Sequence, residues 1–447
     1  MLVSWDTTRA DALGAYADIS VWGVDLDPAQ RPTAQTPQAD SLAKEGVRFR
    51  WALSHAPTTL NAHASLFTGH DPHVHGVPRN GEPLGTGLPV LAERFKAAGW
   101  ETLAVVGSSA LEARMGLNRG FDGYDDKVAT QVRHRVEDPA PVVVARALAA
   151  VDARPDPTIP LFLFVHFYDA HSPWTSAPPV LQAELLPADH GSDVDGGADS
   201  LHRLIKRAHG GRLADEDRRV ARALYLAEVA NQDVGLGTLL KGLEARGHDS
   251  NRLVVLTADH GETLEEVPAN AYGHSKDVNL GAIHVPLIVH GLGRFRTPPG
   301  IVIDRVARLS DVGATMLSMA GIDGGLGTGQ DLSPLWRQPE AMPPAPPHFA
   351  EATKPRLEWK EGQWPNLELH RAVVMDGHMA TRAPILNQAP ALFVLAPGQP
   401  KVTDSSRLSQ MVDALTAWDE VSPTGGSTPM TKATQQALEA LGYLEGP

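Results

Sequence analysis

Short apolar runs alternate with amphipathic stretches along most of the chain. Apolar runs bounded by turn residues predict buried strands, and the stretches between them repeat apolar residues at helical spacing. The predicted strands are Leu2–Trp5, Val47–Leu53, Thr102–Val106, Leu161–Phe167, Leu253–Thr257 and Val285–Val289. This alternation predicts an α/β fold with a largely parallel central sheet and helices on both of its faces.

Helix boundaries are marked by residues that favour helix ends. Thr36 is placed to cap a helix that stops at Gly46, and Thr59 precedes a short helical pattern that stops at Gly69. Residues 215–246 repeat apolar positions at helical spacing, which predicts one long helix.

Three segments depart from the alternation. Residues 181–213 are rich in Gly, Asp and His, which predicts an insertion or lid. A proline-rich stretch at 338–349 marks a boundary, and after it come short strands followed by helical patterns at 406–418 and 431–441. We therefore expect a catalytic domain over 1–337 and a small α+β subdomain over 348–447.

Composition narrows the classes of protein. The chain has 447 residues, 42% of them hydrophobic, which is enough for a large core. Its net charge of −14 disfavours nucleic acid as a general partner. The absence of cysteine excludes disulfides, thiolate metal sites and cysteine nucleophiles. No apolar run approaches the roughly 18 residues that span a bilayer.

The start of the chain bears on its localisation. Met1 is followed directly by the first predicted strand, with no signal peptide before it. We expect a cytoplasmic protein if this start is correct, and an extracytoplasmic one if an export segment is missing.

Polar side chains follow four of the predicted strands. These are Asp6, the hydroxyls of 108–109, the pair Asp169 and His171, and the pair Asp259 and His260. The carboxyl ends of parallel strands share one edge of a sheet, and ligands bind at that edge. We therefore expect these groups to converge there, with Ser108 in contact with the substrate.

Asp6, Asp259 and His260 together offer two carboxylates and one imidazole. This donor set suits a divalent cation, and the imidazole favours Zn or Mn while leaving Mg and Ca open. The alternative is that the two aspartates only cap helices, since each stands where a helix could begin.

Thr59 is a candidate nucleophile. Its hydroxyl is placed at a helix N-terminus, where backbone N–H groups favour an oxyanion. A threonine hydroxyl is a weak nucleophile unless a divalent cation lowers its pKa. The alternative is that Thr58 or Thr59 is only an N-cap, and this stretch considered alone favours that alternative.

Several motifs, taken in order, resemble the sulfatase family of the alkaline phosphatase superfamily. They are "SWDTTRADALGAY", "TTLNAHASLFTGHDPHVHGV", "FYDAHSPW", "VVLTADHGETL" and "YGHSK", and the resemblance runs nearly end to end. It implies an alkaline-phosphatase-like sandwich fold and a metal-dependent hydrolase of sulfate or phosphate esters, arylsulfatase-like or a phosphodiesterase. The implied substrate is a small-molecule, glycan or lipid ester.

The resemblance also implies roles by position. Thr59 takes the nucleophile's place, and Asp6, Asp259 and His260 take metal-ligand places, with Thr59 beside the metal. The remaining matches are His63 in place of an arginine beside the nucleophile, Asn80 as a substrate contact, Lys276 as an anion-binding lysine, and His171 and His274 near the leaving group or, with Asp169, at a second metal.

The chain departs from the family in three places. Threonine cannot become formylglycine, because its β-carbon carries a methyl group, so we expect no formylglycine at Thr59. The family's "GKWHLG" block is missing, and Asn61 replaces a proline. Two alternatives follow, namely a phosphotransferase acting on a glycan or lipid and a catalytically degenerate metal-binding protein. The oligomeric state is left open.

Overall fold

The computed structural model describes residues 1–20, 22, 31–128, 131–132, 135–186, 190–264, 266, 272–338, 344–357 and 363–420. A central eight-stranded sheet organises this part of the chain. Its strands, in spatial order, are β12 (Ile301–Ile303), β2 (Val47–Phe49), β11 (Leu287–Gly291), β9 (Leu253–Ala258), β1 (Leu2–Trp5), β8 (Leu161–Phe167), β4 (Glu101–Val106) and β5 (Gly123–Asp125). Only β11 runs antiparallel to its neighbours, so the predicted largely parallel α/β sheet is confirmed.

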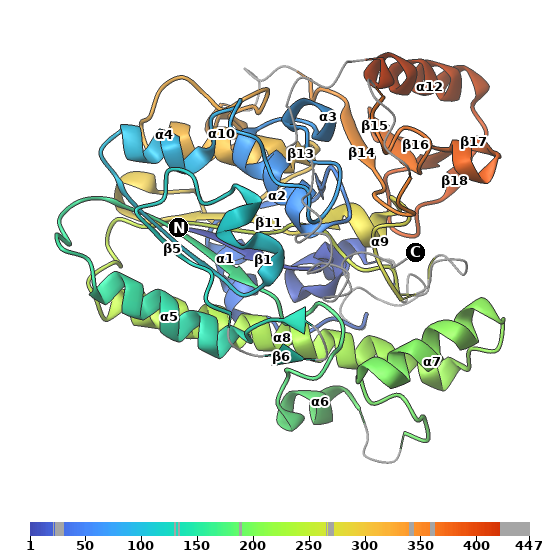
Figure 1. The fold of residues 1–447 in the computed structure, drawn as a ribbon, viewed down its shortest axis with the longest axis horizontal. Coiled ribbons are helices and arrows are strands. Elements are labelled where there is room, and N and C mark those ends of the chain that lie inside the picture. Colours follow the sequence, from blue (N-terminus) through green and yellow to red (C-terminus); the bar gives the residue numbers. More distant parts are fainter. Residues whose placement is uncertain are drawn as a thin grey trace.

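Helices cover both faces of this sheet (Figure 1). One layer contains α1 (Pro37–Glu45), α5 (Ala140–Asp152) and the long α8 (Asp215–Glu244), and the other contains α2 (Thr59–Thr68), α4 (Leu91–Ala97) and α10 (Leu309–Met319). Because both faces are covered, β1 and β9 are buried along their whole length, which explains why their sequences are continuous apolar runs.

Two predicted strands are divided in the structure. The run 47–53 becomes β2 and β3 (Ala52–Leu53), and the run 285–289 becomes β10 (His284–Val285) and β11. Pro286 separates β10 from β11, because proline has no N–H for the ladder. β3 and β10 form a small separate sheet with β13 (Ala307–Arg308).

The predicted helix ends are mostly confirmed. α1 stops before Gly46, and α2 stops at Gly69, whose φ of 71° lies in the left-handed region that glycine favours. Thr36 is the N-cap residue of α1, as predicted, but its side chain makes no capping hydrogen bond within the described chain. Its hydroxyl accepts a hydrogen bond from Gly14 N (3.0 Å) instead, so tertiary packing uses the oxygen that would have capped α1.

A separate antiparallel sheet forms the C-terminal part. Its strands are β14 (His348–Glu351), β15 (Arg371–Met375), β16 (His378–Ala383), β17 (Gln388–Val394) and β18 (Lys401–Val402), and α12 (Ser405–Asp419) packs on it. The predicted small α+β unit has this content, while a helix predicted over 431–441 lies outside the described residues. The boundary between units remains a prediction.

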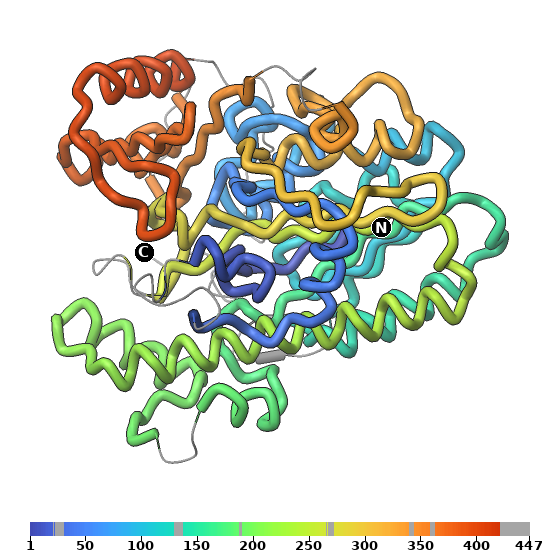
Figure 2. Tube along the Cα trace, turned by 180° about the vertical axis from the view of Figure 1, so that it is seen from behind, coloured from blue at the N-terminus to red at the C-terminus, as the bar shows by residue number. Residues whose placement is uncertain are grey.

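The segment 181–213 contributes helices to the edge of the molecule. α6 (Pro179–Leu185) packs on α8, and α7 (Ala198–His209) follows it. Figures 1 and 2 both place α7 and the C-terminal sheet at the end of the molecule away from the N-terminus. Whether this segment acts as a lid remains a prediction. Among the described residues, no helix has both the length and the apolar character needed to cross a bilayer.

The remaining elements are short. They are α3 (Pro72–His75), α9 (Leu280–Ile283), α11 (Pro334–Arg337) and the hairpin of β6 (Gln131–Val132) with β7 (Arg135–Val136), together with brief 3-10 turns.

Candidate active site

The carboxyl ends of β1, β8 and β9 meet at one edge of the sheet. In the parallel register Trp5 lies between Phe167 and Ala258, so Asp6 and Asp259 leave neighbouring strands at the same level. The backbone N–H of Asp6 donates to Phe167 O (2.8 Å), which fixes the exit of β1. The predicted convergence of residues distant in sequence is confirmed for this pair.

Asp6, Asp259 and His260 each offer one ligand atom within 4.8 Å of the others, and these three residues are called the cation cluster below. Asp259 Oδ1 accepts hydrogen bonds from Thr7 N (3.1 Å) and His260 N (2.7 Å), which holds the carboxylate in place. His260 Nδ1 donates to Gly261 O (2.9 Å), so its Nε2 is the atom left to bind a ligand.

Several buried polar atoms in this region, Thr58 Oγ1 and His166 Nδ1 included, have no hydrogen-bond partner within the described part of the chain, and three others bear directly on the chemistry of the site. These three are Asp259 Oδ2, His260 Nε2 and Thr59 Oγ1. Buried polar atoms are normally satisfied, because an orphaned one costs about 1–3 kcal/mol. Two of these three atoms are ligand types that divalent cations prefer, so the residues present fit a cation.

Electrostatics also favour a cation here. Burial by itself raises the pKa of Asp6, but the hydrogen bond from His166 and the nearby His260 outweigh burial and hold that pKa below its usual range. Burial and the adjacent charge of Asp6 raise the pKa of Asp259 well above its usual range. Two carboxylates that share a buried space compete for ionisation, and a bound cation removes that competition.

Thr59 is the first residue of α2 and is 1% exposed. Thr58 occupies the N-cap position, but its side chain makes no capping hydrogen bond within the described chain. Asn80 Oδ1 instead accepts from Leu60 N (2.8 Å) and so satisfies an early amide of α2. The predicted position of Thr59 at a helix N-terminus is confirmed, and capping by these hydroxyls is not observed.

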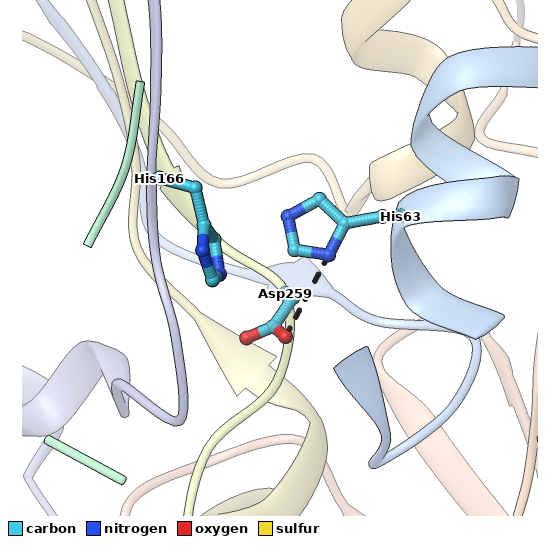
Figure 3. Close-up of side chains that lie close together, drawn as sticks. All are labelled: His63, His166 and Asp259. Carbon is cyan, nitrogen blue, oxygen red and sulfur yellow. Dashed lines mark ion pairs between the residues drawn. The ribbon is translucent and has the colours of Figure 1, made fainter. Parts of the chain in front are cut away.

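His63 joins α2 to the same cluster (Figure 3). Its Nδ1 donates to Thr59 O (2.7 Å) and lies 3.7 Å from Asp259 Oδ2, while its Nε2 is 3.0 Å from Ser4 Oγ. Burial lowers the pKa of His63 to about 3, with His166 as the next cause, so the ring is neutral near pH 7.

His166 is a site residue that sequence reasoning missed. Its Nε2 lies 3.2 Å from Asp6 Oδ2, and it forms a second group of metal-ligand atoms with His63 and Asp259. The signal was a histidine inside the apolar run of β8, one position before the strand's end. Ser4 pairs with His166 in the register of β1 and β8, and its own contact with His63 was missed for the same reason.

His171 and His274 lie together beside His260. The ring centroids of His171 and His274 are 5.0 Å apart, and those of His274 and His260 are 4.6 Å apart. His274 Nδ1 is 3.4 Å from Glu262 Oε1, and its side chain is 16% exposed. These two imidazoles therefore lie next to the cation cluster, where they were expected.

Asp169 does not join them. Its Oδ1 accepts from Asn231 Nδ2 (2.8 Å) and from Ala140 N (3.0 Å), the first residue of α5. The predicted second metal site at Asp169, His171 and His274 is therefore not formed, and these residues make up neither of the ligand groups found among the described residues. The carboxylate faces the helix layer, because α5 begins there and its free amides need an acceptor.

Ser108 and Lys276 are less closely tied to the cluster. Ser108 Oγ accepts from Ala110 N (3.2 Å) and caps a 3-10 turn, which is a structural role. Lys276 is exposed and follows Ser275, whose φ is 78°. The substrate contacts expected of Ser108, Asn80 and Lys276 stay predictions.

Comparison with known proteins agrees with this fold. Residues 1–322 match the Sulfatase family. The ulvan-active sulfatase of Formosa agariphila is 25% identical over 394 residues, covering 83% of this chain and 72% of that protein. The solved phosphonate monoester hydrolase from Silicibacter pomeroyi is similar with a TM-score of 0.66 and 19% identity, covering 94% of each chain.

A second solved structure widens the range of relatives. It is a protein in complex with its substrate D-glucosamine-2-N, 6-O-disulfate, with a TM-score of 0.66 and 14% identity over 99% of this chain and 98% of that one. At this identity the likeness concerns the fold. With a family match that covers most of its length and the strand-edge cluster in place, this chain belongs to the sulfatase family and is an ester hydrolase.

Proposed function

We propose that this chain hydrolyses sulfate or phosphate esters with the Thr59 hydroxyl as the attacking group, at a cation site made by Asp6, Asp259 and His260. One observation carries the proposal. Thr59 Oγ1, Asp259 Oδ2 and His260 Nε2 are all buried and have no hydrogen-bond partner among the described residues. His63 links these groups, since its Nδ1 donates to Thr59 O (2.7 Å) and lies 3.7 Å from Asp259 Oδ2. An attacking hydroxyl and two ligand atoms, all buried and unsatisfied, are what such a reaction requires.

The cation site supplies one part of the chemistry. A divalent cation held by Asp6, Asp259 and His260 would lower the pKa of an alcohol beside it and draw charge from the ester oxygens. His63 and His166 support these residues, since His63 lies 3.7 Å from Asp259 and His166 lies 3.2 Å from Asp6.

The protein's own residues carry the bond changes. Thr59 Oγ1 gives up its proton to water and forms a bond to the sulfur or phosphorus atom, and the bond between that sulfur or phosphorus and the ester oxygen breaks. The alcohol leaves with a proton supplied by His274 or His171, whose rings lie beside His260. Water then attacks the same sulfur or phosphorus, the bond to Thr59 Oγ1 breaks, Oγ1 takes a proton back, and sulfate, phosphate or, from a diester, a phosphate monoester is released. The dipole of α2 favours negative charge at Thr59, which is the first residue of that helix.

Substitution of Thr59 tests the proposal. Thr59→Ala is expected to lower turnover of 4-nitrophenyl sulfate or bis(4-nitrophenyl) phosphate by at least about 1000-fold, because the nucleophile is lost. Metal content, measured by elemental analysis, should stay unchanged.

Thr58→Ala is the matched control, since Thr58 is the adjacent buried threonine and its hydroxyl makes no capping bond. It should retain turnover within about tenfold. Equal losses in both variants, or full activity in Thr59→Ala, would contradict the assignment. Adding an acceptor alcohol to the assay detects transfer in place of hydrolysis.

A further inference from the structure

Arg79 lies between the nucleophile helix and the C-terminal sheet. It precedes Asn80, whose side chain accepts from Leu60 N, the second residue of α2 (2.8 Å). On its other side, Asn366 Nδ2 donates to Pro78 O (2.7 Å), which ties this segment to the C-terminal part. The backbone of Arg79 is therefore held from both directions close to the start of α2.

The guanidinium of Arg79 is buried but poorly satisfied. Its side chain is 6% exposed, and Nε and Nη1 have no hydrogen-bond partner within the described ranges. Glu82 Oε1 lies 3.4 Å from Nε, and Asn366 Oδ1 lies 3.5 Å from Nη2, both long for hydrogen bonds. A buried arginine normally meets an anion through two parallel bonds of about 2.8 Å. Arg79 therefore has unused capacity for an anion.

A second arginine adds positive charge at this place. Burial is the largest cause that lowers the pKa of Arg79; Glu82 opposes it, and the charge of Arg356 lowers that pKa further. Arg356 is exposed, so this charge is open to solvent. Two neighbouring guanidinium groups repel each other unless an anion binds between them.

The loop that carries Arg356 is attached beside the reaction centre. Ser275 O accepts from Lys354 N (2.9 Å), and Ser275 follows His274, whose ring contacts His260 at 4.6 Å between centroids. Lys354 and Arg356 therefore belong to a loop whose backbone is held next to the cation cluster.

Two carboxylates oppose this charge: Glu82, which is the nearer one at 3.4 Å from Arg79 Nε, and Glu351, which is already engaged. Glu351 accepts from Trp364 Nε1 (2.8 Å) and Asn366 Nδ2 (2.8 Å) and pairs with Arg371 (3.2 Å). Glu351 therefore has little capacity left for Arg79, and the long contact with Glu82 leaves Nη1 of Arg79 without a partner among the described residues.

We propose that Arg79, together with Arg356, binds a second anionic group on the part of the substrate that does not react, so that the enzyme acts on esters of compounds that are already acidic, such as carboxylated or sulfated sugars. This inference rests on the proposed function, because it places the non-reacting part of the substrate between Thr59 and the C-terminal sheet. Arg79 is then a specificity-determining residue rather than a catalytic one.

Paired substrates test the inference. The 4-nitrophenyl ester that the protein turns over is compared with its 3-carboxy and 3-sulfo derivatives, which add an anion to the leaving group. Wild type should prefer the acidic esters in kcat/KM by about tenfold or more, because a charge-assisted bidentate contact is gained. In Arg79→Gln the ratio of kcat/KM values for the acidic and the simple ester should fall toward one. Arg79→Lys keeps the positive charge but cannot donate two parallel hydrogen bonds, so it should retain part of the preference.

Arg246→Gln is the matched control, because Arg246 pairs with Asp152 on the surface at the end of α8. It should leave the ratio unchanged. A ratio that survives in Arg79→Gln, or wild type that turns over the simple ester with no preference, overturns the inference while leaving the proposed function intact.

Binding separates this inference from a failure of the proposed function. Calorimetry on Thr59→Ala compares phenylphosphonate with 3-carboxyphenylphosphonate, so no turnover is needed. Tighter binding of the carboxylated ligand that is lost in Thr59→Ala/Arg79→Gln supports the inference even if no ester is hydrolysed. Equal binding of the two ligands overturns it. Melting temperatures show that each variant is folded.

Discussion

Asp259 and Asp169 both follow a parallel strand of the central sheet, yet they have different surroundings. Asp259 directly follows β9, and Asp169 is the second residue after β8. Asp259 uses one oxygen to hold the backbone of Thr7 and His260 and leaves Oδ2 without a hydrogen bond among the described residues. Asp169 is satisfied by Ala140 N and Asn231 Nδ2.

The difference lies in what packs over each strand end. At Asp169, α5 begins directly above the carboxylate and presents free amides to it. At Asp259, the neighbours are Asp6, His260 and His63, which offer ligand atoms and charge. A strand-end aspartate is therefore a candidate metal ligand only where the amides of a helix N-terminus do not already donate hydrogen bonds to its carboxylate.

The largest expected effect comes from exchanging these two aspartates for asparagine. Asp259→Asn removes a negative ligand, so we expect loss of bound metal and a fall in ester turnover of at least about 1000-fold. Asp169→Asn should keep its metal. Elemental analysis and kcat/KM on the same preparations check both, and retention of metal by Asp259→Asn would contradict the comparison.

A smaller effect is expected at His166, which contacts Asp6 rather than the reacting atoms. His166→Phe keeps the ring but removes the nitrogen 3.2 Å from Asp6 Oδ2, so metal affinity should fall about 10–100-fold. His290→Phe, a buried histidine on β11, is the control and should bind metal as wild type does. Calorimetric titration of the metal-free proteins measures the difference, and equal affinities would remove His166 from the site.

The raised pKa of Asp259 predicts how metal affinity depends on pH. Burial and Asp6 favour the protonated form, and a cation binds the deprotonated one, so each binding event releases a proton. Affinity should therefore rise with pH, by up to about tenfold per pH unit below that pKa. Titrations at several pH values should show this slope in Asp169→Asn but not in Asp259→Asn. A slope of zero in wild type would show that Asp259 is already ionised.

The smallest effect concerns stability. Asp169→Asn weakens the acceptor at the start of α5 and should lower the free energy of unfolding by about 1 kcal/mol. The loss is limited because burial raises the pKa of Asp169 to about 6, so its charge is itself costly to keep. Chemical denaturation measures the change. An unchanged free energy of unfolding would mean that Asn231 Nδ2 and Ala140 N form equally stable hydrogen bonds with the asparagine side chain.

Much of the fold follows from local pattern. Continuous apolar runs predicted β1, β8 and β9, because a strand covered on both faces has no solvent-facing positions for polar residues. Where the pattern failed, a tertiary contact had replaced a local one. Thr36 stands at the predicted N-cap of α1, but its hydroxyl accepts from Gly14 N and not from an amide of the helix, which no local pattern predicts.

The candidate site divides in the same way. The strand-end rule, together with residue type, predicted Asp6, Asp259 and His260, and the helix-start pattern placed Thr59. His166 escaped because its role depends on its register with Ser4 on β1, a strand about 160 residues away in the chain.

The sequence by itself determined the order of strands and helices along the chain and the identity of the polar groups at the strand ends. These depend on side-chain chemistry and local periodicity, which neighbouring residues settle. Only the tertiary structure decided which aspartate keeps a free oxygen, that His166 joins Asp6, and that Arg79 lies between α2 and the C-terminal sheet. Those outcomes depend on which residues, distant in the sequence, are packed against a given buried polar atom, and only the tertiary structure determines that.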